Sequence, residues 1–180
     1  FLGATSKTVL NDVLFNGNSS AVEGGAISMR SATQGNNSQA KLDIFDSDFI
    51  GNTAGTNGGA IYSTFYDSKT VKDSVYINDT DFTSNSAKNG GAIYVEGLMD
   101  LGGGKASMKV VDADFERNTA TEMGGAVYNA SNLTLTDVDF KFNTANTLGG
   151  AIYSSGKLDL DKVNFVSNSV IEEDGGALYI

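Results

Sequence analysis

The sequence contains no cysteine, no histidine, no proline and no tryptophan. Without cysteine the chain forms no disulfide, no thiolate metal site and no thiol nucleophile. Without histidine it has no Ser-His-Asp triad, no imidazole base and none of the usual nitrogen ligands of zinc. No apolar run approaches the roughly 18 residues that a membrane-spanning helix needs. These absences exclude the commonest catalytic and metal-binding classes.

Basic residues are also scarce, with 12 Lys and Arg against 22 Asp and Glu and a net charge of −10. They are spread thinly from Lys7 to Lys162, whereas binding to a phosphate backbone needs a basic patch. We therefore predict no nucleic-acid partner. The chain starts at Phe1 without a basic and then apolar leader, so we expect a processed or excised segment.

A two-part motif is present six times and accounts for 12 of the 22 glycines. Its first part is Phe-x-x-Asn followed by Ser or Thr, and its second part is Gly-Gly-Ala followed by Ile, Val or Leu. The first part supplies Phe15, Asn18, Phe49, Asn52, Phe82, Asn85, Phe115, Asn118, Phe140, Asn143, Phe165 and Asn168. The second part supplies Gly24, Gly25, Gly58, Gly59, Gly90, Gly91, Gly124, Gly125, Gly149, Gly150, Gly175 and Gly176. Such internal repetition is typical of solenoids.

The segment before each Phe alternates apolar and polar residues, as at Leu133 and Leu135, which predicts a strand with one buried face. The Phe-to-Phe spacings are 34, 33, 33, 25 and 25, so the unit has about 25 residues and three short strands. We predict an all-β fold, a right-handed parallel β-helix of about six coils. Residues 1–180 would form one segment of a longer chain, with repeats at about 9–28, 42–62, 75–94, 108–128, 133–153 and 158–179.

Each recurring position has a structural role in such a coil. The phenylalanines are expected to stack inward and the asparagines to form a hydrogen-bonded ladder, since asparagine also tolerates the left-handed backbone of a corner. Paired glycines permit a turn that a side chain would block. Core-facing aliphatic residues follow them at Ile27, Ile61, Ile93, Val127, Ile152 and Leu178. A tyrosine follows five of these residues, and we expect the tyrosines to form either an outward, partly exposed ladder or a plug of the interior near a corner. They are Tyr62, Tyr94, Tyr128, Tyr153 and Tyr179.

Acidic residues form two further columns. Three residues before the Phe lie Asp12, Asp46, Asp79, Asp112 and Asp137, and immediately before it lie Asp48, Asp81, Asp114 and Asp139. Such columns could hold calcium or serve glycoside hydrolysis. A catalytic constellation is normally unique, whereas these residues are periodic until Lys162 and Asn164 end the columns. We interpret them as corner residues and predict no catalytic residue, metal site or cofactor, with incidental calcium as the alternative.

The first three intervals carry extra residues at one point of the coil, at about 29–40, 63–73 and 95–106. Insertions in solenoids map to one face, often the binding face. Candidate binding residues in these insertions are Arg30, Phe65, Tyr66, Lys69, Leu98, Met99 and Leu101. Alternatively, the insertions pack on each other as extended hairpins that cover the rod.

The paired motifs, for example FIGNTA at Phe49 and GGAIY at Gly58, resemble the repeat of chlamydial-type polymorphic outer-membrane proteins. The resemblance covers Phe15 to Tyr179, although the first repeat has Ser28 where the others have Tyr. It implies a secreted or surface-anchored autotransporter passenger, extracellular or at a bacterial cell surface, that folds as a β-helix and serves in adhesion.

We therefore predict a non-enzymatic adhesin segment, a rigid rod that presents loops to a protein or glycan of a host cell, a matrix or a neighbouring cell. A second hypothesis is a filament or surface-coat building block that self-associates through the open β-helix ends. A third is a carbohydrate-active enzyme, because the β-helix also hosts such enzymes.

Overall fold

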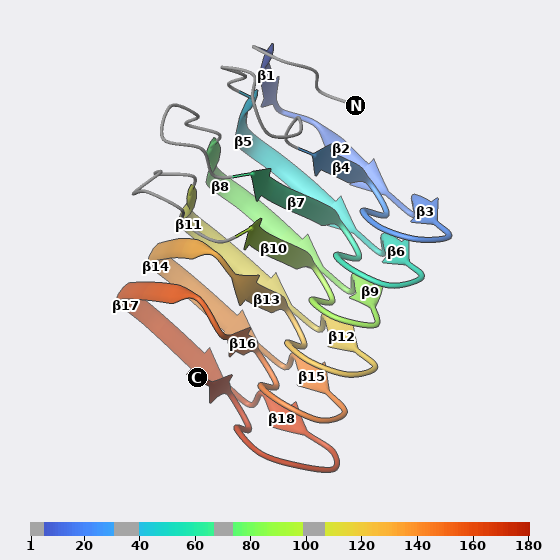
Figure 1. Cartoon of the computed structure of the whole chain (residues 1–180), viewed down its shortest axis with the longest axis vertical. Coiled ribbons are helices and arrows are strands. Elements are labelled where there is room, and N and C mark those ends of the chain that lie inside the picture. Colours follow the sequence, from blue (N-terminus) through green and yellow to red (C-terminus); the bar gives the residue numbers. More distant parts are fainter. Residues whose placement is uncertain (1–5, 31–39, 67–73, 99–106) are drawn as a thin grey trace.

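The computed structural model describes residues 6–30, 40–66, 74–98 and 107–180. These residues form stacked coils of β-strand, and the strands of successive coils lie side by side in three parallel sheets (Figure 1). The described part of the chain contains no helix long and apolar enough to cross a membrane. The predicted all-β fold, a parallel β-helix of about six coils, is confirmed.

The first sheet contains the long strands that precede and include each Phe. In chain order they are β1 (Ser6–Asn11), β2 (Leu14–Asn16), β5 (Ala40–Ile50), β8 (Ser74–Thr83), β11 (Ser107–Glu116), β14 (Asn132–Lys141) and β17 (Lys157–Val166). Neighbouring strands pair in parallel with equivalent residues opposite each other, as Phe49 is to Phe82. The apolar residues alternate as predicted, so Leu133 and Leu135 face the core and are 1% and 0% exposed.

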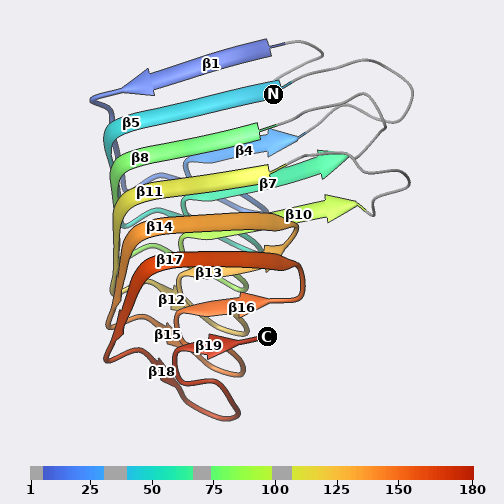
Figure 2. The same ribbon diagram turned by 90° about the vertical axis from the view of Figure 1, so that its left-hand side faces the viewer.

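Two further sheets complete the coil. Strands of two residues form the second: β3 (Ser19–Ser20), β6 (Thr53–Ala54), β9 (Ser86–Ala87), β12 (Thr119–Ala120), β15 (Thr144–Ala145) and β18 (Ser169–Val170). The strands after Gly-Gly-Ala form the third: β4 (Ile27–Arg30), β7 (Ile61–Tyr66), β10 (Ile93–Leu98), β13 (Val127–Ala130), β16 (Ile152–Ser154) and β19 (Leu178–Tyr179). Figure 2 shows the coils one above another, with the long strands bent at one edge.

The phenylalanine column fills the interior as predicted. The rings from Phe15 to Phe165 are stacked with neighbouring centroids 4.7–5.2 Å apart. The middle rings have no exposed surface, and aliphatic residues such as Ile61 and Ile93 pack against them. Because parallel strands lie about 4.8 Å apart, identical residues in register place the rings at van der Waals contact.

Each long strand bends at the residue three before its Phe. There the five aspartates from Asp12 to Asp137 have φ between 47° and 56°, and Lys162 has φ 53°. Aspartate adopts this left-handed conformation more readily than most residues because its short side chain bonds to the nearby backbone. The interpretation as corner residues is confirmed for this column. It is wrong for the second column, because Asp48, Asp81, Asp114 and Asp139 lie within the strands after the bend and are not left-handed.

The asparagine ladder is also confirmed and runs from Asn18 to Asn168. In the middle of the rod, Asn85 donates from its backbone N–H and from its Nδ2 to Oδ1 of Asn118, at 2.9 and 3.0 Å. Asn85 Nδ2 also donates to the carbonyl of Phe49 at 2.8 Å. The expectation that the asparagines themselves take the left-handed conformation is wrong. The residue before each asparagine does so instead, as at Ser84 with φ 57°.

The two glycines of each Gly-Gly-Ala are required for different reasons. Gly90 has φ 61°, a conformation that costs free energy for any residue with a Cβ. Gly91 does not adopt the left-handed conformation but lies against the next coil, where an added Cβ would fall 2.1 Å from the carbonyl oxygen of Gly125. One glycine therefore makes the turn and the other lets the coils approach.

The tyrosines stack on the outward side of the third sheet, with neighbouring ring centroids 4.5–5.6 Å apart. Tyr62 and Tyr94 are only 6% and 8% exposed and so are more buried than predicted. Burial, reinforced by the charge of Glu23, raises the pKa of Tyr62 to about 12. Burial likewise raises the pKa values of Tyr94 and Tyr128. Tyr62, Tyr94 and Tyr128 therefore stay neutral above the ordinary pKa of tyrosine.

Candidate functional site

Among the predicted binding residues whose side chains the structure describes, only Arg30 is largely exposed. It ends β4, forms an ion pair with Glu23 and places its guanidinium 5.3 Å from the ring centroid of Tyr62. The first coil has Ser28 in the tyrosine column, opposite Tyr62. Arg30 thus interacts with the first ring of the ladder through a cation–π contact.

The other predicted binding residues have different outcomes. Phe65 is fully buried and belongs to the hydrophobic core. It is therefore not available to anchor a partner, and the prediction that it is a binding residue is wrong. Tyr66 and Leu98 end β7 and β10 and lie opposite each other in the strand pair. Lys69, Met99 and Leu101 lie outside the described residues.

The predicted insertions begin later than the sequence suggested. Met29, Ser63 and Val95 lie on strands and have no exposed surface, because they continue the inward alternation of the third sheet. The remaining segments, 31–39, 67–73 and 99–106, lie outside the described residues. The strands that border them end and begin at the same corner of three successive coils (Figure 2). In the fourth coil only Ser131 separates β13 from β14 at that corner.

The two aspartate columns line a shallow hollow on the outside of β8, β11, β14 and β17. Its volume is about 520 Å³, and its lining residues are Asp79, Asp81, Asp112, Ala113, Asp114, Asp137, Asp139, Lys162 and Asn164. Within the described residues, no three carboxylates are placed to hold a metal ion. Calcium needs six to eight oxygen ligands, so the hypothesis of incidental calcium finds no ligand set here.

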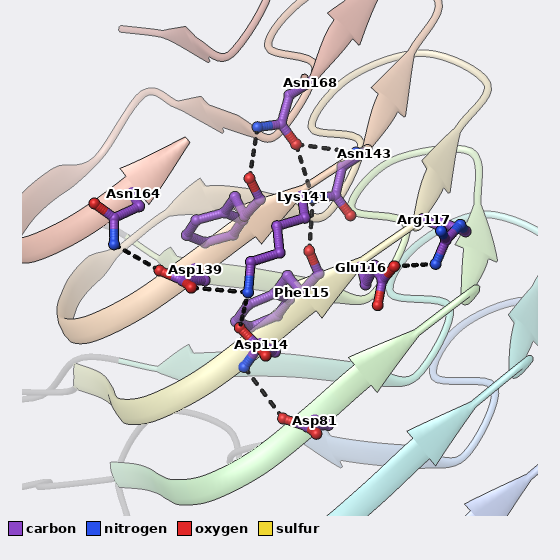
Figure 3. A network of polar contacts seen from close by, with 11 residues as sticks. Asp81, Asp114, Phe115, Glu116, Arg117, Asp139, Lys141, Asn143, Asn164 and Asn168 are labelled. Carbon is purple, nitrogen blue, oxygen red and sulfur yellow. Dashed lines mark hydrogen bonds and ion pairs between the residues drawn. The ribbon is translucent and has the colours of Figure 1, made fainter. Parts of the chain in front are cut away.

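Lys141 neutralises one end of this hollow (Figure 3). Its Nζ lies 3.1 Å from Oδ1 of Asp114 and 2.8 Å from Oδ2 of Asp139, bridging two coils. Asn164 donates a hydrogen bond of 2.7 Å to Asp139. The bonds from Lys141 and Asn164 lower the pKa of Asp139 below its ordinary value, and the carboxylates raise that of Lys141.

The other end of the hollow keeps its negative charge. Among the described residues, no lysine or arginine forms an ion pair with Asp79, Asp81 or Asp112. Burial raises the pKa of Asp81 despite a hydrogen bond from the backbone N–H of Asp114, and the charges of Asp114 and Asp48 raise it further. The outer face of the rod is therefore acidic at β8 and compensated at β14.

The sequence analysis did not identify a second feature, at the next corner of the coil. The two variable residues of each Phe-x-x-Asn motif point outward there, and the second of them, directly after β14, is Phe142. Phe142 is 48% exposed, and the guanidinium of Arg117 lies 5.3 Å from its ring centroid. The signal was present in the sequence, because Phe142 occupies a position that holds Gly, Ser or Arg in the other five copies.

The fold and these surfaces define a β-helical repeat protein whose core is uniform and whose outer face changes from coil to coil. The family model of the Chlamydia polymorphic membrane protein repeat matches three copies, at residues 12–29, 46–64 and 79–96. The predicted resemblance is thus confirmed for these three copies. Each match runs from the left-handed corner residue into the third sheet, and the same positions recur in register in the later coils. No curated protein and no solved structure matches the chain.

Proposed function

We propose that this chain is a non-enzymatic adhesin segment of the cell surface, a rigid β-helix that presents its variable insertions for attachment. The observation that carries the proposal is that three successive coils are interrupted at one corner by segments that differ in sequence, while the coils themselves repeat. Solenoids concentrate insertions on one face, which is often the binding face. The repeat of a surface protein family supports the assignment to an exposed location.

The structure suggests how to remove these segments while keeping the coils in register. Arg30, Thr64, Glu96 and Ala130 occupy equivalent positions in the third sheet, and in the fourth coil a single serine follows before the next strand. Replacing 31–40, 65–73 and 97–106 each by one serine would therefore give every coil the same short turn. The loss of buried Phe65 can be limited by a second variant that keeps residues up to 66.

The deletion variant is expected to lose attachment of beads coated with the protein to cultured epithelial cells and to matrix-coated surfaces. The physical reason is that the partner contacts reside in the removed segments, whereas the coil is common to all copies. The readout is the fraction of beads retained under flow, and circular dichroism checks that the β-helix is intact. Full attachment by a folded deletion variant would contradict the role of the insertions.

Assembly through the coil ends is a second candidate, favoured by an apolar hollow of about 300 Å³ at β1 and β4 whose lining includes Leu10, Phe15 and Ile27. Within the described residues, no amide donates to Asn18 Oδ1, whereas each later asparagine of the ladder accepts two such bonds. A further coil stacked on this end would cover the apolar hollow and donate to Oδ1 of Asn18. Analytical ultracentrifugation of the 180-residue chain is then expected to show concentration-dependent association, reduced by Leu10→Lys. A monomer at every concentration would rule out this candidate.

A further inference from the structure

The corner between the first and second sheets places a non-glycine residue in the left-handed conformation in four coils. The second variable residue of each Phe-x-x-Asn motif is left-handed, with φ 53–66° in all six coils. These residues are Gly17, Gly51, Ser84, Arg117, Phe142 and Ser167. Glycine adopts this conformation without penalty, whereas a bulky residue such as phenylalanine is an outlier. Strained residues of this kind cluster at functional sites.

Packing does not explain why Phe142 occupies this corner. Its ring is about half exposed, and Val166, the neighbouring outward residue in the next coil, is 46% exposed. Arg117 lies over the ring from the preceding coil, while the next coil has the short Ser167 in the same column. An apolar surface is therefore left open beside an arginine, and phenylalanine and arginine are both enriched in protein interfaces.

The charges around this corner indicate what would bind. Lys141 is engaged by Asp114 and Asp139, and Arg117 by Glu116, so the described cations beside Phe142 are already compensated. In the acidic hollow, Asp79, Asp81 and Asp112 of β8 and β11 form no ion pair with a described lysine or arginine. From Phe142 a ligand of these carboxylates crosses two coils and runs three to five residues along the strands to Asp81 and Asp79, a span of about 14–19 Å, which about five or six extended residues cover.

We propose that this corner and the adjoining acidic hollow form a docking surface for a basic, extended segment of a partner protein. An apolar side chain of that segment packs on Phe142 and Val166. Its lysines or arginines lie over Asp79, Asp81 and Asp112, where opposite charge gives specificity and rapid association. This surface lies at a different corner from the insertions, so it acts independently of the adhesion proposed above.

The probe for this surface is a fluorescein-labelled peptide, Leu-Gly-Lys-Gly-Lys-Gly-Lys, and a companion in which glycine replaces the leucine. Binding is followed by fluorescence anisotropy at low salt and at 0.5 M salt. Phe142→Gly is expected to weaken the leucine peptide about tenfold and to leave the glycine peptide unchanged, because only the first peptide has an apolar anchor. Phe142→Ser, which copies Ser84 and Ser167, is expected to behave alike.

The charge contribution is tested by changing three carboxylates at once. D79N/D81N/D112N is expected to weaken both peptides at least tenfold at low salt and to have little effect at 0.5 M salt, where exposed charges are screened. The matched control, E172Q/E173Q/D174N, removes the same charge from the exposed loop before β19 and is expected to change neither affinity. The proposal would be overturned if a Phe142 variant weakened both peptides equally or weakened neither. It would also be overturned if E172Q/E173Q/D174N weakened binding as much as D79N/D81N/D112N. A raised unfolding midpoint for Phe142→Gly would show that the variant is folded and that the strain is relieved.

Discussion

Gly91→Ala is expected to lower the free energy of unfolding by at least about 4 kcal/mol or to prevent folding, a loss reserved for severe steric conflicts. The added methyl group would lie 2.1 Å from the carbonyl oxygen of Gly125 and 2.7 Å from backbone atoms of Thr119. All of these atoms belong to the backbone of the next coil, so no side chain can rotate away. Equilibrium urea unfolding followed by circular dichroism measures the effect.

Gly176→Ala is the matched control for this prediction. Gly176 is the second glycine of the last Gly-Gly-Ala, and the nearest atom to its added methyl group is the carbonyl oxygen of Asn168 at 3.9 Å. This substitution is expected to change stability by less than about 1 kcal/mol, since an ordinary contact distance imposes no strain. Equal losses in the two variants would show that contact between coils is not the reason for the second glycine.

Asn118→Ala is expected to cost about 4 kcal/mol, because the side chain makes four hydrogen bonds and the site is fully buried. Truncation leaves the backbone N–H and the Nδ2 group of Asn85 without their acceptor. It also leaves the carbonyl of Phe82 without this donor and Oδ1 of Asn143 with one donor fewer. Buried groups that lose their partners carry the full cost of desolvation.

Asn18→Ala separates the ladder from a general effect of removing asparagine. The Asn18 side chain makes one ladder bond, from Nδ2 to Oδ1 of Asn52 at 2.9 Å, and its backbone N–H keeps its own bond to the same oxygen. We expect a loss of about 1 kcal/mol, measured by the same urea titration. A loss at Asn118 no greater than that at Asn18 would contradict a ladder that stabilises the rod.

The repeated positions were predictable because each coil imposes the same environment on them. Six phenylalanines, six asparagines and six glycine pairs at matching spacing leave few alternatives to stacked coils. The left-handed residue was misassigned for a physical reason. Asparagine favours that conformation in isolation, but in this coil its amide is needed for the ladder, so the preceding residue makes the turn.

The variable positions were harder to predict, since repetition gives no information about them. Phe65 was expected on a binding loop, yet it continues the alternation of Ile61 and Ser63 and points into the core. Phe65 lies four residues after Ile61, so the two-residue period of a strand places both side chains on the inward face. Phe142 is one of the two variable residues of Phe-x-x-Asn, so the motif gives no information about it. Only the backbone geometry shows that this position is strained.

The pairing of every strand with the equivalent strand of the next coil has a mechanical consequence. The hydrogen bonds between coils run along the length of the rod, so a pull on its two ends loads them one coil at a time instead of shearing whole strands together. Each coil contacts its immediate neighbours, so detachment proceeds from an end in steps. A released unit of 25 residues extends by about 80–90 Å. Under tension, such a rod lengthens gradually and dissipates the applied force while its remaining coils stay folded.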